Sequence, residues 1–189
     1  MISVAPARAL ASSPLAIERC DPEVLQLVTR PEVHLVVWRR PLPASLEWLS
    51  RLDWSRIDDL DFVAGVDRLE AEIGGGLAEA GYPAGARGDA LLDEIAGHAR
   101  RFAAIHSLDA VTIRLEVIDT DACRKFHADY VTARLLATLV GPGTQWIYGI
   151  APTDAPVRQL RTGDVGIFKG RLGADPLAIL HRSPPLTDT

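Results

Sequence analysis

The chain has 189 residues, a formal net charge of −5 and a hydrophobic fraction of 48%. This length predicts one domain that can bury a core without help from disulfides or a structural metal. The acidic balance argues against a nucleic-acid binder, and no apolar stretch approaches the roughly 20 residues needed to cross a bilayer. Cys20 and Cys123 lie far apart with no CxxC pairing, which fits a reducing compartment. We therefore expect a cytoplasmic protein with no nucleic-acid or membrane partner.

The N-terminal part of the sequence mixes one strand pattern with several helical patterns. Residues 1–30, with Pro6 and Pro14, predict a loosely ordered arm. Val33–Trp38 is β-branched and ends before a Pro-Leu-Pro breaker, so it predicts a strand. Apolar residues then recur at helical spacing, which predicts helices over 44–52, 67–80 and 89–105. We expect residues 31–108 to be mainly helical.

From residue 109 onward the pattern changes to short strands separated by Gly, Pro and Asp turns. The first, Val111–Ile118, alternates and is β-branched, as a strand requires. Further candidates follow at 134–140, 145–150, 158–160, 165–169 and 177–181. Several short strands in succession are typical of an antiparallel barrel or jelly roll. Helices followed by strands predict an α+β fold within a single domain, residues 1–189.

The candidate chemistry lies just beyond the first of these strands. His127 and Asp129 are two residues apart, so in an extended segment both side chains leave the same face. His181 ends the last predicted strand and could return beside them. Two imidazoles and one carboxylate form the facial triad common in non-haem Fe(II) oxygenases. The sequence therefore predicts a divalent metal site, with Fe(II) favoured over Zn(II).

Zinc is the alternative, because Cys123 precedes His127 by four residues. If that segment were helical, thiolate and imidazole would share a face and could close a tetrahedral site. Such a site would leave no position open for a substrate. The protein would then serve zinc binding or metal homeostasis without catalysis. A third possibility is a structural or interaction module that holds no metal.

Longer motifs carry a resemblance to a known family. The segments VHLVVWRRPLP, CRKFHADYVTARLLATLVGPGTQW, GDVGIFKG and HRSPP, spread over residues 31–185, resemble the bacterial family called domain of unknown function 1826. The order HxD, then GDVxIF, then HR is similar to the double-stranded β-helix of cupins and 2-oxoglutarate/Fe(II) oxygenases. The remoter resemblance implies a cupin-like core with iron and 2-oxoglutarate as cofactors, acting on an unknown small-molecule or peptide substrate.

That resemblance also implies a basic side chain that anchors the cosubstrate carboxylate. In such oxygenases this residue usually lies on a strand beyond the distal histidine, but only eight residues follow His181 here. Arg134 and Arg182 are therefore the candidates for cofactor binding, with Lys169 as a further possibility. A guanidinium suits the role because it meets a carboxylate with two parallel hydrogen bonds.

Overall fold

The structure is a computed structural model that describes residues 15–120, 124–149 and 156–185. It has a mixed α+β fold, as predicted. The helical elements are η1 (Pro22–Thr29), η2 (Ala44–Arg51), η3 (Trp54–Arg56), η4 (Val66–Arg68), α1 (Leu69–Glu79) and α2 (Ala86–His106), in which η marks a 3-10 helix. The strands are β1 (Ala16–Arg19), β2 (Leu35–Trp38), β3 (Leu60–Gly65), β4 (Ala110–Leu115), β5 (Ala133–Ala137), β6 (Gln145–Tyr148), β7 (Arg158–Gln159), β8 (Val165–Lys169) and β9 (Ile179–Arg182). No helix in the described part of the chain is long and apolar enough to span a membrane.

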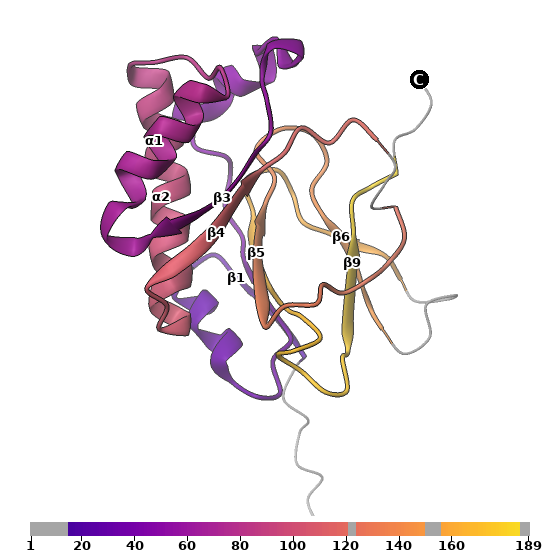
Figure 1. Cartoon of the computed structure of the whole chain (residues 1–189). Coiled ribbons are helices and arrows are strands. Elements are labelled where there is room, and N and C mark those ends of the chain that lie inside the picture. Colours follow the sequence, from indigo (N-terminus) through magenta and orange to yellow (C-terminus); the bar gives the residue numbers. More distant parts are fainter. Residues whose placement is uncertain (1–14, 121–123, 150–155, 186–189) are drawn as a thin grey trace, which may run out of the picture.

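The strands form three separate sheets. A central sheet has the order β1-β2-β8-β5, in which β1 is parallel to β2 and the other pairs are antiparallel. An antiparallel sheet of β7-β6-β9 lies on one side of it, and α1 and α2 lie on the other (Figure 1). Strands β3 and β4 form an antiparallel pair of their own beside the helices. The molecule is therefore layered, with the central sheet in the middle.

Both faces of the central sheet are buried. On β2, Val36 packs toward η1 and α2, whereas Leu35 and Val37 pack against the β6–β9 side. On β8, Ile167 and Phe168 divide between the same two clusters. Burial on both faces explains why these strands are continuous apolar runs rather than alternating ones.

The helical layer has its own core. Helices α1 and α2 pack on the inner face of β3 and β4, with Leu69, Ile73 and Leu91 fully buried. Phe102 of α2 packs against this cluster and also against the one that covers the central sheet. This single aromatic side chain therefore connects the two parts of the core.

The Gly163-Asp164 turn before β8 is fixed by a buried carboxylate. Asp164 is fully buried and accepts hydrogen bonds from the side chain of Arg39 and from the backbone N–H groups of Arg40, at 3.1 Å, and Arg161, at 2.7 Å. Gly163 has a φ of 90°, and a Cβ there would lie 2.3 Å from the backbone nitrogen of Leu42. The Gly163-Asp164 turn therefore joins the start of β8 to the residues that follow β2.

The N-terminal half is less helical than predicted. Strand β3 was not expected, and β1 and η1 lie in the segment predicted to be a loose arm. The predicted helix at 44–52 is the 3-10 helix η2, whose buried Leu46 and Leu49 are three residues apart, the repeat of a 3-10 helix. The other strand predictions agree with the structure to within a few residues, although Ile150 lies outside the described residues.

Candidate metal centre

The backbones of two predicted ligands pair directly. The N–H of His127 donates to the carbonyl of His181 at 3.0 Å, and the N–H of His181 donates to the carbonyl of His127 at 2.9 Å. Residues directly opposite in an antiparallel pair direct their side chains to the same face. The two imidazole rings accordingly lie 4.8 Å apart between centroids. His127 thus lies along the edge of β9 that faces away from β6 and adds a one-residue bridge to the β7-β6-β9 sheet.

Asp129 completes the cluster from the same segment as His127. Its carboxylate oxygens lie 3.8 Å from His127 Nε2 and 3.3 Å from His181 Nε2. One donor atom from each of the three residues falls within 4.8 Å of the others. The side chains of Asp129 and His181 are 14% and 8% exposed, whereas that of His127 is 37% exposed. The predicted ligands thus converge on one point that is open on the His127 side.

The surroundings of His127 determine its tautomer. Its Nδ1 lies 2.8 Å from the carbonyl oxygen of Lys125. Because a carbonyl oxygen can only accept a hydrogen bond, Nδ1 carries a proton, and in the neutral ring the lone pair lies on Nε2, 3.8 Å from Asp129. A backbone carbonyl on the far nitrogen is a common way to orient a metal-binding histidine.

One carboxylate oxygen of Asp129 lacks a hydrogen bond. Oδ2 is buried and lies 3.3 Å from His181 Nε2 and 3.1 Å from Arg134 Nε, but neither group has the alignment of a hydrogen bond. The proximity of His181, aided by the charges of Arg134 and His127, outweighs burial and lowers the pKa of the Asp129 carboxyl. Asp129 is thus held ionised beside Arg134 and His181, and a carboxylate must be ionised to bind a metal.

The candidate carboxylate anchors fall in different places. The Nε of Arg134 lies 3.1 Å from Asp129 Oδ2, so Arg134 contacts the cluster directly. Arg182 points to the other face of β9, where it donates to Gln145 at 2.8 Å and to the carbonyl of Arg124 at 3.2 Å. Lys169 is tied to the carbonyls of Arg30 and Pro31. Of these three candidates, only Arg134 therefore adjoins the cluster. Cys123, the fourth ligand of the zinc alternative, lies outside the described residues.

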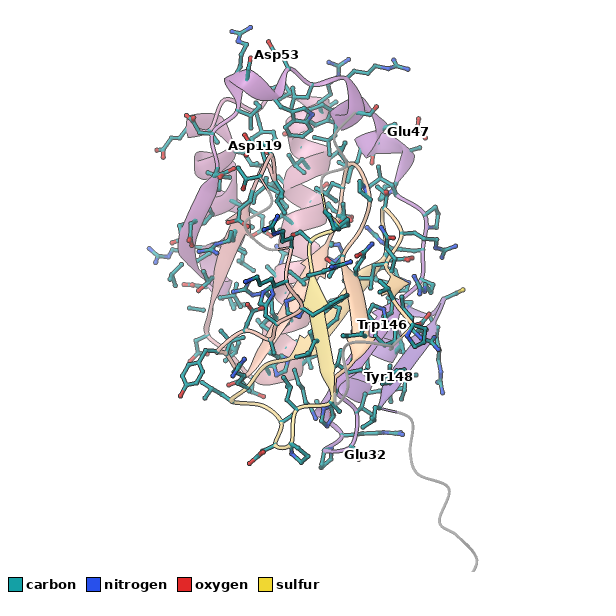
Figure 2. The ribbon with its side chains drawn as sticks, turned by 90° about the vertical axis from the view of Figure 1, so that its right-hand side faces the viewer. Glu32, Glu47, Asp53, Asp119, Trp146 and Tyr148 are labelled. Atoms are coloured by element: carbon teal, nitrogen blue, oxygen red, sulfur yellow. The ribbon has the colours of Figure 1, made fainter. Side chains whose placement is uncertain are left out.

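Aromatic side chains near β6 are mainly structural. Trp146 is fully buried in the core between the sheets, and Tyr148 packs edge-on against it with ring centroids 5.4 Å apart (Figure 2). Phe168 contacts His181, with ring centroids 4.9 Å apart. This apolar backing limits the movement of the His181 ring.

Arg114 is a neighbour of the site that sequence reasoning did not identify. It lies on β4 and pairs with Asp61, at 2.5 Å, and with Glu116, at 3.6 Å. The hydrogen bonds that Arg114 donates to Asp61 raise the pKa of Arg114, and the charges of Glu116, Asp61 and Asp129 add to this effect. The influence of Asp129 on Arg114 depends on packing between elements distant in the chain, which strand alternation alone does not reveal.

Fold and site together define a mixed α+β protein with a two-histidine, one-carboxylate cluster beside its three-stranded sheet. A family model described as "Protein of unknown function (DUF1826)" matches residues 19–189. The chain therefore belongs to this family, in agreement with the resemblance found in its motifs. No curated protein and no solved structure matches the chain.

Proposed function

We propose that the protein is a non-haem Fe(II) oxygenase of the 2-oxoglutarate type. His127 Nε2, one oxygen of Asp129 and His181 Nε2 would hold one divalent metal. The observation that carries this proposal is the convergence of these three donors within 4.8 Å. Two imidazoles and one carboxylate on one face leave further coordination positions open, which distinguishes a catalytic site from a closed structural one.

The details of the donors support a metal at this point. The unsatisfied Asp129 Oδ2 would gain a partner, and the tautomer of His127 already directs a lone pair toward Asp129. All three residues are tied to neighbouring backbone or charged groups, so little side-chain freedom would be lost on binding. The donor set therefore fits Fe(II), and it fits Zn(II) as well.

The layering supports a double-stranded β-helix core as part of the same proposal. The antiparallel pair β5–β8 faces the antiparallel pair β6–β9 across a shared apolar core that contains Leu136 and Ile179. The two candidate histidines pair at the edge of the second sheet. In this arrangement the sheets would form the rigid support, and His127, Asp129 and His181 would hold the metal beside β9.

Arg134 is the residue we propose for anchoring 2-oxoglutarate. Its Nε contacts Asp129, and among the described residues Asp129 is its one carboxylate partner within 4.0 Å. A metal on Asp129 would take up that negative charge and leave the terminal nitrogens of Arg134 to a second carboxylate. The metal would supply a centre that activates dioxygen. The protein would contribute orientation, charge and exclusion of water.

Metal analysis and 2-oxoglutarate binding test the proposal together. Protein without a histidine tag is purified anaerobically, and its metal content is measured by mass spectrometry beside His127→Ala and the control His106→Ala. We expect one equivalent of iron that is lost in His127→Ala and kept in His106→Ala. Calorimetry should then show 2-oxoglutarate binding to the iron form and weaker binding to Arg134→Gln. Iron binding without 2-oxoglutarate binding would overturn the oxygenase assignment.

Zinc binding is the alternative that the same samples distinguish. One equivalent of zinc that disappears in Cys123→Ser would indicate a closed site serving metal homeostasis. Retention of metal in Cys123→Ser is the result expected from the open site. We also propose a cytoplasmic location. Two cysteines distant in sequence suit a reducing compartment, where Fe(II) persists.

A further inference from the structure

A turn that follows β8 holds the ligand segment, residues 127–132, which carries His127 and Asp129. The turn spans residues 170–173 and is closed by a hydrogen bond from the N–H of Gly173 to the carbonyl of Gly170 at 3.0 Å. Three of its N–H groups donate to carbonyls of the ligand segment: Gly170 to Thr132 at 3.0 Å, Arg171 to Asp129 at 2.9 Å and Leu172 to Val131 at 3.1 Å. The turn therefore gives the ligand segment the hydrogen-bond partners that a neighbouring strand would otherwise supply.

Arg171 binds the ligand segment with its side chain as well as with its backbone. Its Nε donates to the carbonyl of Ala128 at 3.2 Å, and its N–H donates to the carbonyl of Asp129 at 2.9 Å. These two carbonyls belong to the peptide groups that precede and follow the α-carbon of Asp129. Because a residue has only two soft backbone dihedrals, φ and ψ, contacts to both peptide groups fix the backbone of Asp129 and with it the direction of the side chain.

The turn approaches the ligand segment too closely for side chains to fit between them. A Cβ on Gly170 would lie 2.1 Å from the carbonyl oxygen of Val131, and a Cβ on Gly173 would lie 2.0 Å from that of Thr132. Glycine at both ends of the turn allows this close approach. A larger residue at either position must therefore push the turn and the ligand segment apart.

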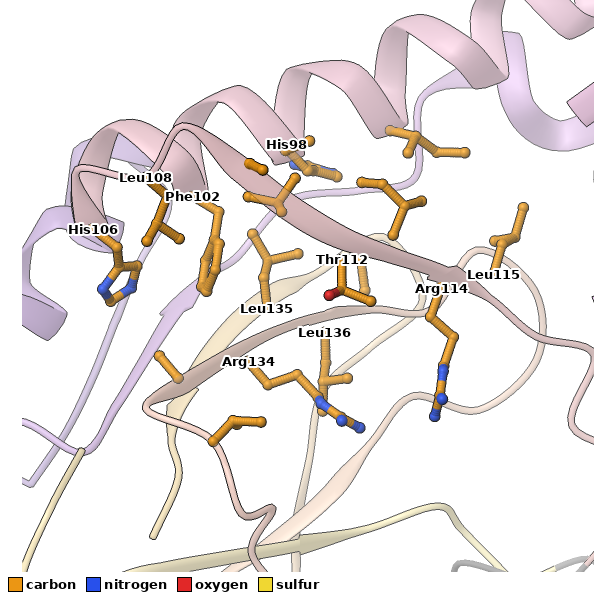
Figure 3. Close-up of a pocket in the computed structure, with 18 of the residues that line it drawn as sticks. His98, Phe102, His106, Leu108, Thr112, Arg114, Leu115, Arg134, Leu135 and Leu136 are labelled. Carbon is orange, nitrogen blue, oxygen red and sulfur yellow. The ribbon is translucent and has the colours of Figure 1, made fainter. Parts of the chain in front are cut away.

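The same stretch of chain also supports the third ligand. Phe168 of β8, two residues before the turn, packs against His181 with ring centroids 4.9 Å apart. The ligand segment itself continues into β5, where Arg134 points away from α2 (Figure 3) and lies 3.1 Å from Asp129. Strand β8 and its turn thus contact both Asp129 and His181, which come from distant parts of the chain.

We propose that Arg171 is a positioning residue of the metal centre, which fixes the backbone of Asp129 so that its carboxylate faces the two histidines. The inference rests on the proposed function, because it concerns the metal that these ligands would hold. A ligand fixed in advance loses little freedom on binding, and removal of such supporting contacts typically weakens metal binding about 10–100-fold. Arg171 is itself exposed, so its loss should affect metal affinity more than stability.

Cobalt(II) is the probe, because its visible absorption reports the geometry of its ligands. Titration of metal-free protein in competition with a chelator measures the affinity, and circular dichroism measures the melting temperature. We expect Arg171→Ala to bind Co(II) roughly tenfold more weakly and with an altered absorption spectrum. Its melting temperature without metal should stay within about 4 °C of the parent's, the effect of one lost hydrogen bond in a chain of this length. Arg171→Lys keeps a donor and should restore most of the affinity.

Gly173→Ala tests the close approach of the turn. The new methyl group should displace the ligand segment and weaken Co(II) binding at least roughly tenfold. Gly97→Ala is the matched control, because no atom lies within 4 Å of the place that its Cβ would take. Arg68→Ala is the control for Arg171→Ala, because the Arg68 side chain is 69% exposed and pairs with Glu72. Both control variants should bind Co(II) as tightly as the parent.

The outcomes separate this inference from the proposed function. If the parent binds Co(II) and Arg171→Ala has the same affinity and spectrum, the positioning role is overturned and the metal proposal stands. Weaker binding by Arg171→Ala that comes with a large fall in melting temperature would indicate a general loss of structure and would also overturn it. Co(II) binding by the parent without 2-oxoglutarate binding overturns the oxygenase alone. A parent that binds no Co(II) overturns the metal proposal, and the positioning role falls with it.

Discussion

Replacing Asp164 with asparagine is expected to destabilise the protein by about 3 kcal/mol. Asp164 is fully buried and is contacted by two arginine side chains, Arg39 and Arg161, besides two backbone N–H groups. Loss of one partner from a buried ion pair costs roughly 3–5 kcal/mol. Arg39 keeps its second partner, Glu18, at 2.6 Å, so we place the cost at the lower end.

For a chain of 189 residues, about 3 kcal/mol corresponds to a fall in Tm of roughly 6–12 °C. Circular dichroism melting and urea unfolding followed by tryptophan fluorescence would measure it. Glu70→Gln is the control, because its pair with Arg100 is half-exposed and should contribute at most about 1 kcal/mol. Equal stabilities of the two variants would refute the assignment of Asp164 as the residue that fixes the turn before β8.

Three further predictions follow from the same geometry. Gly163→Ala should destabilise by at least about 2 kcal/mol, measured by urea unfolding, since φ is 90° and the new Cβ would lie 2.3 Å from Leu42 N. Burial alone would raise the pKa of Asp164, but its hydrogen bonds outweigh burial and lower it. The resulting stability should be complete above about pH 4 and decline as the pH falls through the folded-state pKa, and acid melting curves of Asp164→Asn should lack this decline. Arg182→Gln should leave metal content and 2-oxoglutarate affinity unchanged by mass spectrometry and calorimetry, because Arg182 faces away from His181; weaker 2-oxoglutarate binding would contradict this placement.

Much of the fold could be predicted where local pattern and final environment agree. The apolar run of β2, the glycine-aspartate turn before β8 and the periodic face of α2 each determine their own structure. Strand β3 was missed because Leu60–Gly65 has an uneven burial pattern and little alternation. Its strand conformation depends on pairing with β4, which is distant in sequence.

The candidate site could be predicted in its members but not in its surroundings. The spacing of His127 and Asp129 and the strand-end position of His181 were enough to bring three donors together. The separation of Arg182 from the cluster follows from alternation along β9, which a strand assignment alone could have indicated. The influence of Asp129 on Arg114 depends on how nonadjacent strands pack together, for which the sequence has no local signal.

The separation of the β3–β4 pair from the central sheet also has a consequence for cooperative unfolding. Among the described residues, no hydrogen-bonded ladder joins the β3–β4 pair to the central sheet, and Phe102 packs against the clusters on both sides. Cooperativity between the two parts therefore passes through side-chain packing along α2. We therefore expect the part containing α1, β3 and β4 to open in a step separate from the unfolding of β6 and β9, which carry the histidine pair.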